Sequence, residues 1–417
     1  MSIQFGHKFR EQHFPLINSK GFTSVNHGSY GMLPLVLIEK LNEVTSEFYS
    51  APDKYVFKTH FENYNNALSA MGQFLGCASD NLAFVTGGTV AVNTILRSLP
   101  LEKGDVFVIP HTTYSFCKKT FDFLVDTLAV EVVVLDYELP ISHDDIIAQF
   151  RDVFERKKVK MAFFDTVSSM PSVKLPYREL TSLCAEYGVL SYVDAAHGAG
   201  LLPIHFEAMN FKPDFFSTNL HKWLYYPYTF TVLYVDPKHQ KSIQTFPITD
   251  TYQNPAQSNF FNHKFESQTR GHYMKLAMVQ PAIEFRSKIC GGEDHILDYC
   301  TELSAATKKM VEERWPGARA ISNKNNDCLD SAMTTICVPD EISSAFAHVD
   351  SAKRAAYLEK LVDELLDTYK TFMPLFFYKE KLCFRVSAQI YNELSDYEYA
   401  IDSLKSAITQ LIEEHDL

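Results

Sequence analysis

A lysine and an aspartate, each at the end of an apolar run, are the residues of this sequence best placed to do chemistry. Lys222 closes the stretch 214–222, and Asp194 closes the stretch 190–194. A lysine in a dry cleft can lose its proton and attack a carbonyl carbon. A lysine that forms a Schiff base and an aspartate that holds a pyridinium nitrogen are the pair that pyridoxal phosphate (PLP) requires. The two stretches therefore predict a PLP site.

A glycine-rich turn upstream is a candidate cradle for the phosphate of that cofactor. An apolar strand expected at 82–85 breaks into a Thr-Gly-Gly-Thr turn, and a helix is expected at 90–97. Glycines let the backbone approach a ligand, and a helix N-terminus offers free N–H groups to an anion. We assign Gly88 and Thr89 to the phosphate because the lysine and the aspartate occur downstream. A dinucleotide site is disfavoured, since the GxGxxG spacing is absent.

Further polar and aromatic residues follow other expected strands. Tyr114 follows the strand at 105–110, where an aromatic ring can stack on a pyridine ring. Asn219 and His221 flank the lysine and are candidate donors to the phosphate. Each of these residues can also have a purely structural role. Tyr114 can cover the start of a helix, and the side chains of Asn219 and His221 can form hydrogen bonds within the core. Asp165 ends another strand, where support of the cofactor or capping of the next turn is favoured over catalysis.

Alternating strand and helix signals predict an α/β fold with a mostly parallel, seven-stranded sheet that has helices on both faces. The expected strands lie at 82–85, 105–110, 130–135, 161–166, 190–194, 215–217 and 230–235. Sheets of this kind bind ligands beyond the carboxyl ends of their strands, which is where the candidate residues stand. After about residue 289, helices alternate with apolar strands, which predicts a smaller α+β domain.

These patterns divide the chain into three expected parts. The segment 1–35 is expected to pack with the small domain, 36–288 to form the large PLP-binding domain, and 289–417 to form the small domain. The residues up to about Phe22 are expected to be partly mobile. Within the large domain, helices are expected at 35–50 and 59–76, with Gly76 as the cap of the second.

An arginine inside an apolar run is the candidate for substrate binding. Arg385 lies in the stretch 382–387, which reads as a buried strand. A buried guanidinium needs an anionic partner, and its planar fork fits a carboxylate with two hydrogen bonds. The alternatives are a structural salt bridge or the carboxylate of an amino-acid substrate, and the neighbouring candidates favour the substrate.

Composition limits the classes of partner. The 417 residues are 46% hydrophobic and carry a formal net charge of −12, which disfavours nucleic acid and anionic membrane surfaces. Neither a signal sequence nor a membrane-spanning run is recognisable. The 8 cysteines show no metal-ligand spacing, so we expect no metal and a reducing, cytosolic location, with presence in the nucleus left open.

The segments 193–197 and 219–223 together resemble PLP enzymes of fold type I in the class V aminotransferase family. The most similar branch is the isopenicillin-N-epimerase-like one, which includes cysteine desulfhydrases and the carbon–sulfur lyases that cleave hercynylcysteine sulfoxide in ergothioneine synthesis. The resemblance extends from about Asn26 to about Asn392 and involves several separate motifs. It implies PLP as cofactor and a homodimer with shared active sites.

The resemblance also implies roles for individual residues. Asn26 and His27 match a segment that reaches over the mouth of the active site, and Arg385 matches the arginine that holds the substrate's α-carboxylate. His197 takes the place of a residue near the phenolic oxygen of the cofactor ring. Thr269 matches a threonine that crosses the dimer interface to the neighbour's cofactor phosphate. Around that threonine Gln268 and Gly271 depart from the usual residues, which leaves the loop geometry in doubt.

In the lyase branch a tyrosine at the place of Tyr114 acts on the leaving group, so the resemblance favours β-elimination from a cysteine-derived thioether or sulfoxide. The products are a thiol or sulfenate, pyruvate and ammonia. Cysteine desulfhydration, transamination and epimerisation on the same site stay open. A cysteine persulfide mechanism is disfavoured, because Cys383 stands within a strand two residues from Arg385. A non-catalytic interaction protein is disfavoured by the joint presence of the lysine, aspartate, arginine and phosphate turn.

Overall fold

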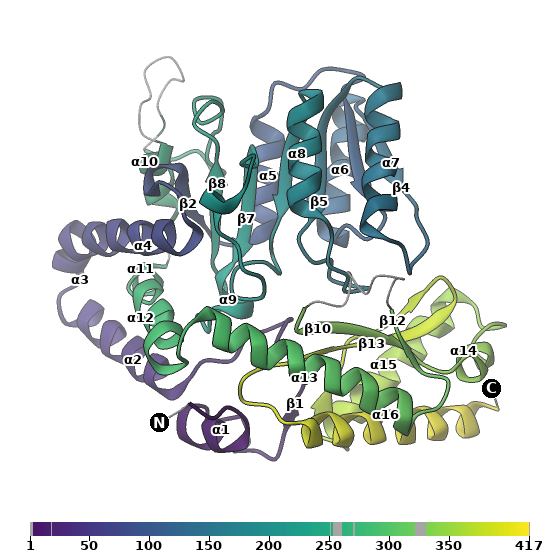
Figure 1. The fold of residues 1–417 in the computed structure, drawn as a ribbon. Helices are drawn as coiled ribbons and strands as arrows, with labels where there is room; N and C mark the ends of the chain where they lie inside the picture. The colour runs from purple at the N-terminus through teal and green to yellow at the C-terminus, as the bar shows by residue number, and fades with distance from the viewer. Residues whose placement is uncertain are drawn as a thin grey trace.

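A seven-stranded sheet forms the centre of the larger part of the molecule (Figure 1). The computed structural model describes residues 3–17, 19–250, 252, 261–269, 272–321 and 331–416. The strand order is β2-β8-β7-β6-β5-β3-β4. The strands are β2 (Leu82–Val85), β3 (Val106–Pro110), β4 (Glu131–Leu135), β5 (Val159–Asp165), β6 (Leu190–Asp194), β7 (Phe215–Asn219) and β8 (Thr231–Val235). Only β8 runs antiparallel to its neighbours in this sheet, so the predicted mostly parallel, seven-stranded fold is confirmed.

The strands are apolar on both faces because helices cover both faces. Along β5, Met161 and Phe163 belong to one buried cluster, whereas Ala162 and Phe164 belong to another. The first cluster includes side chains of α5 (Gly88–Ser98) and α6 (Ser115–Leu128). The second includes side chains of α7 (His143–Arg156) and α8 (Tyr177–Tyr187). Near-continuous apolar strands are typical of parallel sheets buried on both sides.

A group of helices lies beside the β2 edge of the sheet (Figure 1). The expected helices at 35–50 and 59–76 correspond to α2 (Leu35–Ser50) and α4 (His60–Leu75). Gly76 ends α4 with φ +64°, and a Cβ there would lie 2.3 Å from the ring of His205, so the predicted glycine cap is confirmed. The neighbouring elements are α3 (Pro52–Lys54), η1 (Tyr55–Thr59), η2 (Ser79–Asn81), α10 (Phe261–Glu266), η4 (Ser267–Thr269), α11 (Tyr273–Leu276), α12 (Val279–Glu284) and η5 (Phe285–Ile289).

The C-terminal part contains an antiparallel four-stranded sheet with long helices beside it. The sheet order is β12 (Leu375–Tyr378), β13 (Lys381–Ser387), β10 (Met333–Cys337) and β9 (Arg319–Ala320). The helices are α13 (Glu293–Arg314), α14 (Asp340–Ala345), α15 (Ser351–Asp367) and α16 (Leu394–His415). The division of the chain at residues 35 and 288 stays a prediction.

The N-terminal segment packs against the C-terminal part through the residues described there, and its partial mobility up to about Phe22 stays a prediction. The helix α1 (His7–His13) places Arg10 against Asp396 of α16, with Nη1 donating to Oδ1 at 2.9 Å. Phe9 and Phe14 are buried. The strand β1 (Thr23–Ser24) pairs in parallel with β11 (Thr371–Phe372). Buried aromatic rings and a buried ion pair account for this packing.

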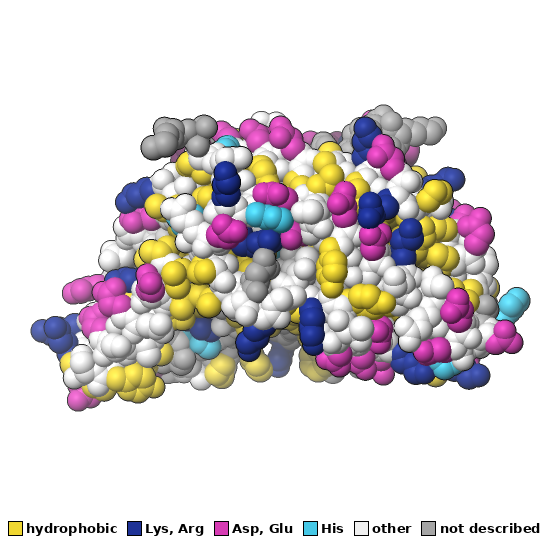
Figure 2. Space-filling view, turned by 90° about the horizontal axis from the view of Figure 1, so that it is seen from below, with side chains coloured by type: hydrophobic (Ala, Val, Ile, Leu, Met, Phe, Trp, Pro, Cys, Tyr) yellow, Lys and Arg dark blue, Asp and Glu magenta, His cyan; other side chains and the backbone are white. Residues whose placement is uncertain are grey.

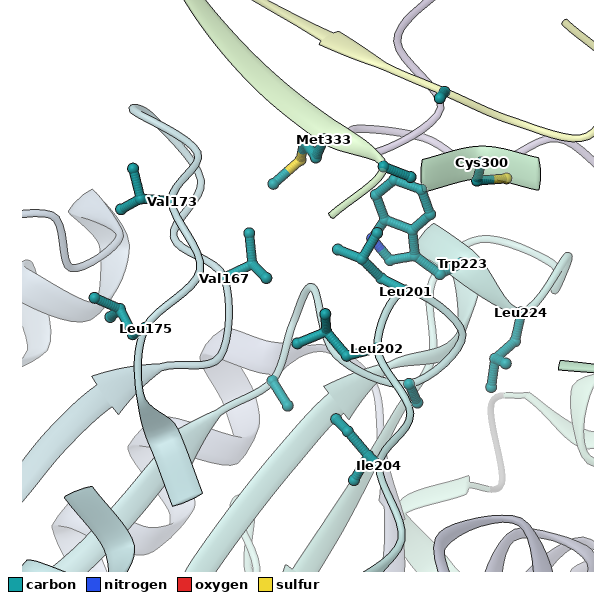
Figure 3. Packing of buried hydrophobic residues seen from close by; sticks show 14 of the residues in the cluster. Val167, Val173, Leu175, Leu201, Leu202, Ile204, Trp223, Leu224, Cys300 and Met333 are labelled. Atoms are coloured by element: carbon teal, nitrogen blue, oxygen red, sulfur yellow. The ribbon is translucent and has the colours of Figure 1, made fainter. Parts of the chain in front are cut away.

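Trp223 joins the two parts of the core. Figure 3 shows its indole ring beside Leu201, with Met333 of β10 and Cys300 of α13 nearby. The ring is 1% exposed. The lysine next to it is therefore fixed on a rigid element, the short helix α9 (Leu220–Trp223) that follows β7.

The surface shows no extended area of a single charge in the view of Figure 2, where basic side chains lie among acidic ones. In the part of the chain that the structure describes, none of the helices combines the length and the hydropathy needed to span a bilayer. Within the same residues, no group of three or more His, Cys, Asp or Glu is arranged to hold a metal ion.

Candidate active site

A cavity of about 410 Å³ lies at the carboxyl ends of the parallel strands, where residues of the N-terminal and C-terminal parts also contribute. Strand ends and the turns after them supply most of its wall, as expected for an open α/β sheet. The lining includes Gly88, Thr89, Tyr114, Asp165, Asp194, His197, Asn219, His221, Lys222 and Arg385. Most of the residues predicted from separate segments of the sequence are thus brought together.

Lys222 supplies the amine of this cavity. Its Nζ lies 3.2 Å from Nε2 of His197. The pKa of Lys222 is lowered to about 8, chiefly by burial; the negative charge of Asp194 opposes this shift, and the positive charge of Arg385 contributes to it. A lysine with such a pKa has a substantial fraction of free amine near neutral pH, so it can act as a nucleophile or a base.

The neighbouring indole determines which nitrogen of His197 faces the lysine. Nε1–H of Trp223 donates to Nδ1 of His197 at 3.2 Å, so Nδ1 is the acceptor and Nε2 carries the proton of the neutral ring. Burial lowers the pKa of His197 well below its usual range, and the charge of Lys222 adds to the effect. His197 therefore presents a neutral N–H donor to Nζ of Lys222, which favours the free amine.

Two buried carboxyl groups line the cavity at the ends of neighbouring strands. Asp165 at the end of β5 and Asp194 at the end of β6 are directly paired in the register of the sheet. Oδ1 of Asp194 accepts from the backbone N–H of Ala196 at 2.9 Å, and Sγ of Cys117 lies 3.7 Å from Oδ2. Burial raises the pKa of Asp194, and the N–H of Ala196, the charge of Lys222 and the thiol of Cys117 oppose that shift by stabilising the carboxylate.

The glycine turn provides an anion site at the start of α5. Gly88 begins this helix, and Thr89 follows, so unpaired backbone N–H groups face the cavity. A Cβ at Gly88 would lie 3.1 Å from Oδ1 of Asn219, which leaves no free room for a side chain there. Oδ1 of Asn219 accepts from Oγ1 of Thr231 at 2.6 Å. A glycine at position 88 thus avoids a tight contact between a Cβ and Asn219 at the start of the helix.

His221 also lines the cavity, but its ring is held by the backbone. Nδ1 of His221 lies 3.3 Å from both the carbonyl oxygen and the amide nitrogen of Phe230, and the ring packs edge-on against Tyr228. Burial lowers the pKa of His221 to about 4. The side chain is neutral at physiological pH.

Arg385 is buried in the wall of the cavity with neutral partners only. Nη1 donates to the carbonyl oxygen and the hydroxyl of Ser169 at 3.1 and 3.2 Å, and Nη2 donates to Oδ1 of Asn26 at 2.9 Å and to the hydroxyl of Ser29. None of the carboxylates in the described ranges forms a salt bridge with it, and Nε has no hydrogen-bond partner there. Burial lowers the pKa of Arg385 to about 10. This uncompensated charge is suited to an anionic ligand.

Aromatic side chains surround the entrance. Tyr114 precedes α6 and is 39% exposed, and Phe116, Tyr30 and Tyr228 are 58%, 63% and 59% exposed. The rings of Tyr30 and Tyr228 are 5.5 Å apart. Partial burial raises the pKa of Tyr114. Its hydroxyl therefore keeps its proton at neutral pH and can donate it.

Three predicted residues do not line this cavity. His27 is buried, its Nδ1 lies 2.9 Å from the hydroxyl of Tyr391, and its ring packs against Trp223; its contact with substrate stays a prediction. Asn26 contacts the cavity wall indirectly, because its Oδ1 accepts a hydrogen bond from Arg385, which lines the cavity. Thr269 is buried and donates to the carbonyl oxygen of Glu266 at 2.6 Å. Its contact with a second subunit stays a prediction, and Gly271 lies outside the described residues.

Cys117, Ser29 and Ser169 are functional candidates that the sequence did not reveal. Cys117 lies on α6, which covers the sheet, and Ser29 and Ser169 lie in turns whose direction depends on the packing of the two parts. Small polar residues in turns carry no signal of their own. By contrast, Cys383 is fully buried beside Cys337 on β10, and it does not line the cavity.

The sequence matches the family aminotransferase class V over residues 30–356. The chain belongs to the class V aminotransferase family. The predicted family, its fold type and its cofactor, PLP, are thereby confirmed, as is the prediction of an enzyme.

Similar proteins are found in several organisms. Hercynylcysteine sulfoxide lyase of Schizosaccharomyces pombe is 27% identical, over 96% of this chain and 97% of that protein. L-cysteine desulfhydrase of Arabidopsis thaliana is 24% identical, over 94% and 88%. Isopenicillin N epimerase of Amycolatopsis lactamdurans is 22% identical, over 92% and 94%. The solved structure of C-DES, with glycine covalently linked to its PLP cofactor, superposes with a TM-score of 0.74 at 15% identity, over 95% of this chain and 98% of that one.

The residues of the cavity fit PLP. The cofactor is a phosphorylated pyridine aldehyde, and the cavity has an amine for the aldehyde, a helix N-terminus without room for side chains for the phosphate, and a buried carboxylate for the ring nitrogen. Lys222, Gly88 with Thr89, and Asp194 would hold these three groups. Tyr114 would cover the ring. These assignments of individual residues stay predictions.

Proposed function

We propose that this enzyme cleaves the carbon–sulfur bond of a cysteine-derived thioether or sulfoxide by β-elimination. One substrate and one water molecule give a thiol or sulfenic acid, pyruvate and ammonia. The observation that carries the proposal is that Arg385 and Lys222 line the same cavity. Arg385 is a buried guanidinium with neutral partners only, and Lys222 has a lowered pKa. The α-carboxylate of an amino-acid substrate would bind Arg385, and its α-proton would be taken by Lys222.

The side chains of this chain divide the work of the reaction. PLP, when bound, withdraws electrons from the substrate's α-carbon and so makes loss of the α-proton and of the β-substituent accessible. The Nζ of Lys222 takes the α-proton, because burial lowers the pKa of Lys222 to about 8 and His197 presents an N–H donor to it. Arg385 fixes the α-carboxylate with its fork, which orients the bond to be broken.

Tyr114 is our candidate for the acid that protonates the departing sulfur. It lines the same cavity as the amine and the guanidinium and is 39% exposed, so a β-substituent that extends toward solvent could meet it. Its hydroxyl is protonated at neutral pH, as that of an ordinary tyrosine is, and so can serve as a proton donor. Transfer of that proton neutralises the negative charge that develops on the sulfur as the bond breaks.

The aromatic entrance favours a conjugate over free cysteine. Exposed rings such as Tyr30, Phe116 and Tyr228 offer apolar faces to a planar or cationic S-substituent. Free cysteine has no group that would reach them. We therefore place the substrate among bulky S-substituted cysteines, of which hercynylcysteine sulfoxide in ergothioneine synthesis is the example suggested by the yeast relative. Desulfhydration of cysteine is the second candidate, suggested by the plant relative.

We also propose a cytosolic homodimer with shared active sites. The proposal rests on the match of Thr269 to a threonine that contacts a neighbour's cofactor phosphate. In this chain Thr269 is anchored by Glu266, next to the buried contact of that glutamate with His60 at 2.7 Å. Sedimentation of the PLP-loaded protein tests the oligomeric state, and a monomer that retains full activity contradicts shared sites.

Product analysis tests the reaction type. The PLP-loaded protein is incubated with an S-alkyl cysteine sulfoxide in deuterated water without a keto acid. We expect pyruvate and ammonia in equal amounts. Deuterium incorporation into recovered substrate without pyruvate indicates epimerisation, and turnover that requires an added keto acid indicates transamination. Either result overturns the proposal.

A further inference from the structure

Asp165 and Asp194 are equivalent in position but not in surroundings. They are register partners at the ends of β5 and β6, they are 4% and 5% exposed, and both line the cavity. Asp194 receives an N–H from Ala196 and faces the thiol of Cys117. Oδ2 of Asp165 is buried and has no hydrogen-bond partner among the described residues. One carboxyl group of the pair thus has donors, and the other has an oxygen without a partner at the cavity wall.

The turn after β5 does not use this oxygen. The hydroxyl of Ser168 donates to the carbonyl oxygen of Pro171 at 2.6 Å, and its own N–H donates to the carbonyl oxygen of Val173 at 3.0 Å. The hydroxyl and the N–H of Ser168 are thus satisfied without Oδ2 of Asp165, and the capping role considered for Asp165 from the sequence stays a prediction. The unpaired oxygen is left for a group within the cavity.

The charges around the pair allow one negative carboxylate more readily than two. Asp194 on β6 faces Asp165, and the cations that act on Asp165 are Lys222 on α9 and Lys118 on α6. Cys117 faces Asp194, and Arg385 and His197 line the same cavity. Burial and the charge of Asp194 together raise the pKa of Asp165 well above its usual range. Adjacent buried carboxyl groups that share a site commonly hold one proton between them.

We propose that Asp165 holds this proton and presents a neutral O–H donor to an anionic oxygen of the bound cofactor, while Asp194 stays ionised. Asp165 is then a hydrogen-bond donor to the cofactor, and Asp194 is a negative charge opposite the cofactor's ring nitrogen, although both are aspartates at the ends of neighbouring strands. The inference depends on the cofactor and not on which bond the enzyme breaks. It makes Asp165 a cofactor-binding residue.

Infrared difference spectra between the PLP-loaded wild-type protein and its PLP-loaded variants test whether the carboxyl group of Asp165 is protonated. We expect the wild-type protein at neutral pH to show the carbonyl stretch of a protonated carboxylic acid, shifted in deuterated water, and Asp165→Asn to lack it. Asp214→Asn is the matched control, because Asp214 is a buried aspartate whose pKa is lowered to about 2 by its contacts with His239 and Lys238. This control should keep the band. A band that persists in Asp165→Asn overturns the proposal.

Cofactor affinity provides a second readout that does not involve a substrate. Asparagine keeps an N–H donor at this position, whereas leucine has the volume without the donor. We expect the dissociation constant for PLP to rise less than about 3-fold in Asp165→Asn and at least about 10-fold in Asp165→Leu, as for loss of one hydrogen bond to a charged group. Equal affinity of the leucine variant and the wild type contradicts a donor role. If Asp165→Leu does not fold, the infrared result decides alone.

Discussion

The indole Nε1–H of Trp223 donates to Nδ1 of His197 at 3.2 Å, and Nε2 of the same ring lies 3.2 Å from Nζ of Lys222. Because a neutral imidazole carries one proton, the first contact places that proton on Nε2. Nε2 can then donate to a free amine but repels an ammonium group. A residue buried between the two parts of the core thus controls the protonation of the lysine next to it.

Replacement of Trp223 should change the protonation of Lys222. In Trp223→Phe the donor is lost and both tautomers of His197 become available, so we expect kcat to fall about 10-fold, the equivalent of one hydrogen bond. The acid limb of the pH profile of kcat should also move to higher pH. Trp315→Phe is the control, because Trp315, the chain's second tryptophan, packs against Phe384 outside the cavity. Superimposable pH profiles for Trp223→Phe and wild type would refute the tautomer argument.

The lowered pKa of Lys222 predicts how the cofactor-free protein takes up PLP. Burial lowers the pKa of Lys222 to about 8, so the fraction of free amine rises about 10-fold per pH unit below 8 and levels off above it. The uptake rate, followed by absorbance, should show the same dependence. The unfolded chain binds more protons than the folded chain between about pH 8 and 10.4, so this lysine favours folding increasingly as pH rises through that window. An uptake rate still rising at pH 10 would contradict the assignment.

Arg385 should affect substrate binding more than the chemical step. Arg385→Lys keeps a positive charge but loses the planar fork, so we expect kcat/KM to fall about 100-fold, mainly through a higher KM. Steady-state kinetics with one S-substituted cysteine check this split. Arg314→Lys, in an exposed pair with Asp402, is the control and should change kcat/KM less than 2-fold. An unchanged KM in Arg385→Lys would argue that the arginine is only structural.

Tyr114 should matter most when the leaving group is a strong base. A thiolate needs a proton as it departs, whereas a sulfenate is the weaker base and leaves more readily. We therefore expect Tyr114→Phe to lower kcat about 100-fold for a thioether but less than about 10-fold for the corresponding sulfoxide. Tyr399→Phe, whose hydroxyl bonds the backbone of Tyr369, serves as the control. Equal losses for both substrates would remove Tyr114 from the role of acid.

The sequence predicted the sheet and most of the cavity because both depend on local patterns. Lys222, Asp194 and Gly88 follow apolar strands, and parallel strands bring their carboxyl ends to one edge. The short strands β1 and β11 were not predicted, because two residues give too little periodicity. The ion pair that Arg10 forms was not predicted either, since its partner lies 386 positions away in the sequence.

The surroundings of individual site residues have the same dependence on packing. His27 and Asn26 lie close in the sequence to residues that line the cavity, but their side chains contact Tyr391 and Arg385, which no local pattern predicts. Conversely, Asp165 was left without an assigned role because a strand-end aspartate often caps a turn. Its unpaired oxygen became visible only when the partners of the turn, Ser168 with Pro171, were known.

The most direct test of the proposed function is pyruvate release by the PLP-loaded protein. A bulky cysteine sulfoxide conjugate, its thioether and L-cysteine are compared at equal concentration, with Lys222→Ala alongside. We predict pyruvate from the conjugates, at a kcat/KM at least about 10-fold above that for L-cysteine, and none above background from Lys222→Ala. Absence of pyruvate from every S-substituted cysteine, with the cofactor absorbance still responding to amino acids, would contradict a carbon–sulfur lyase.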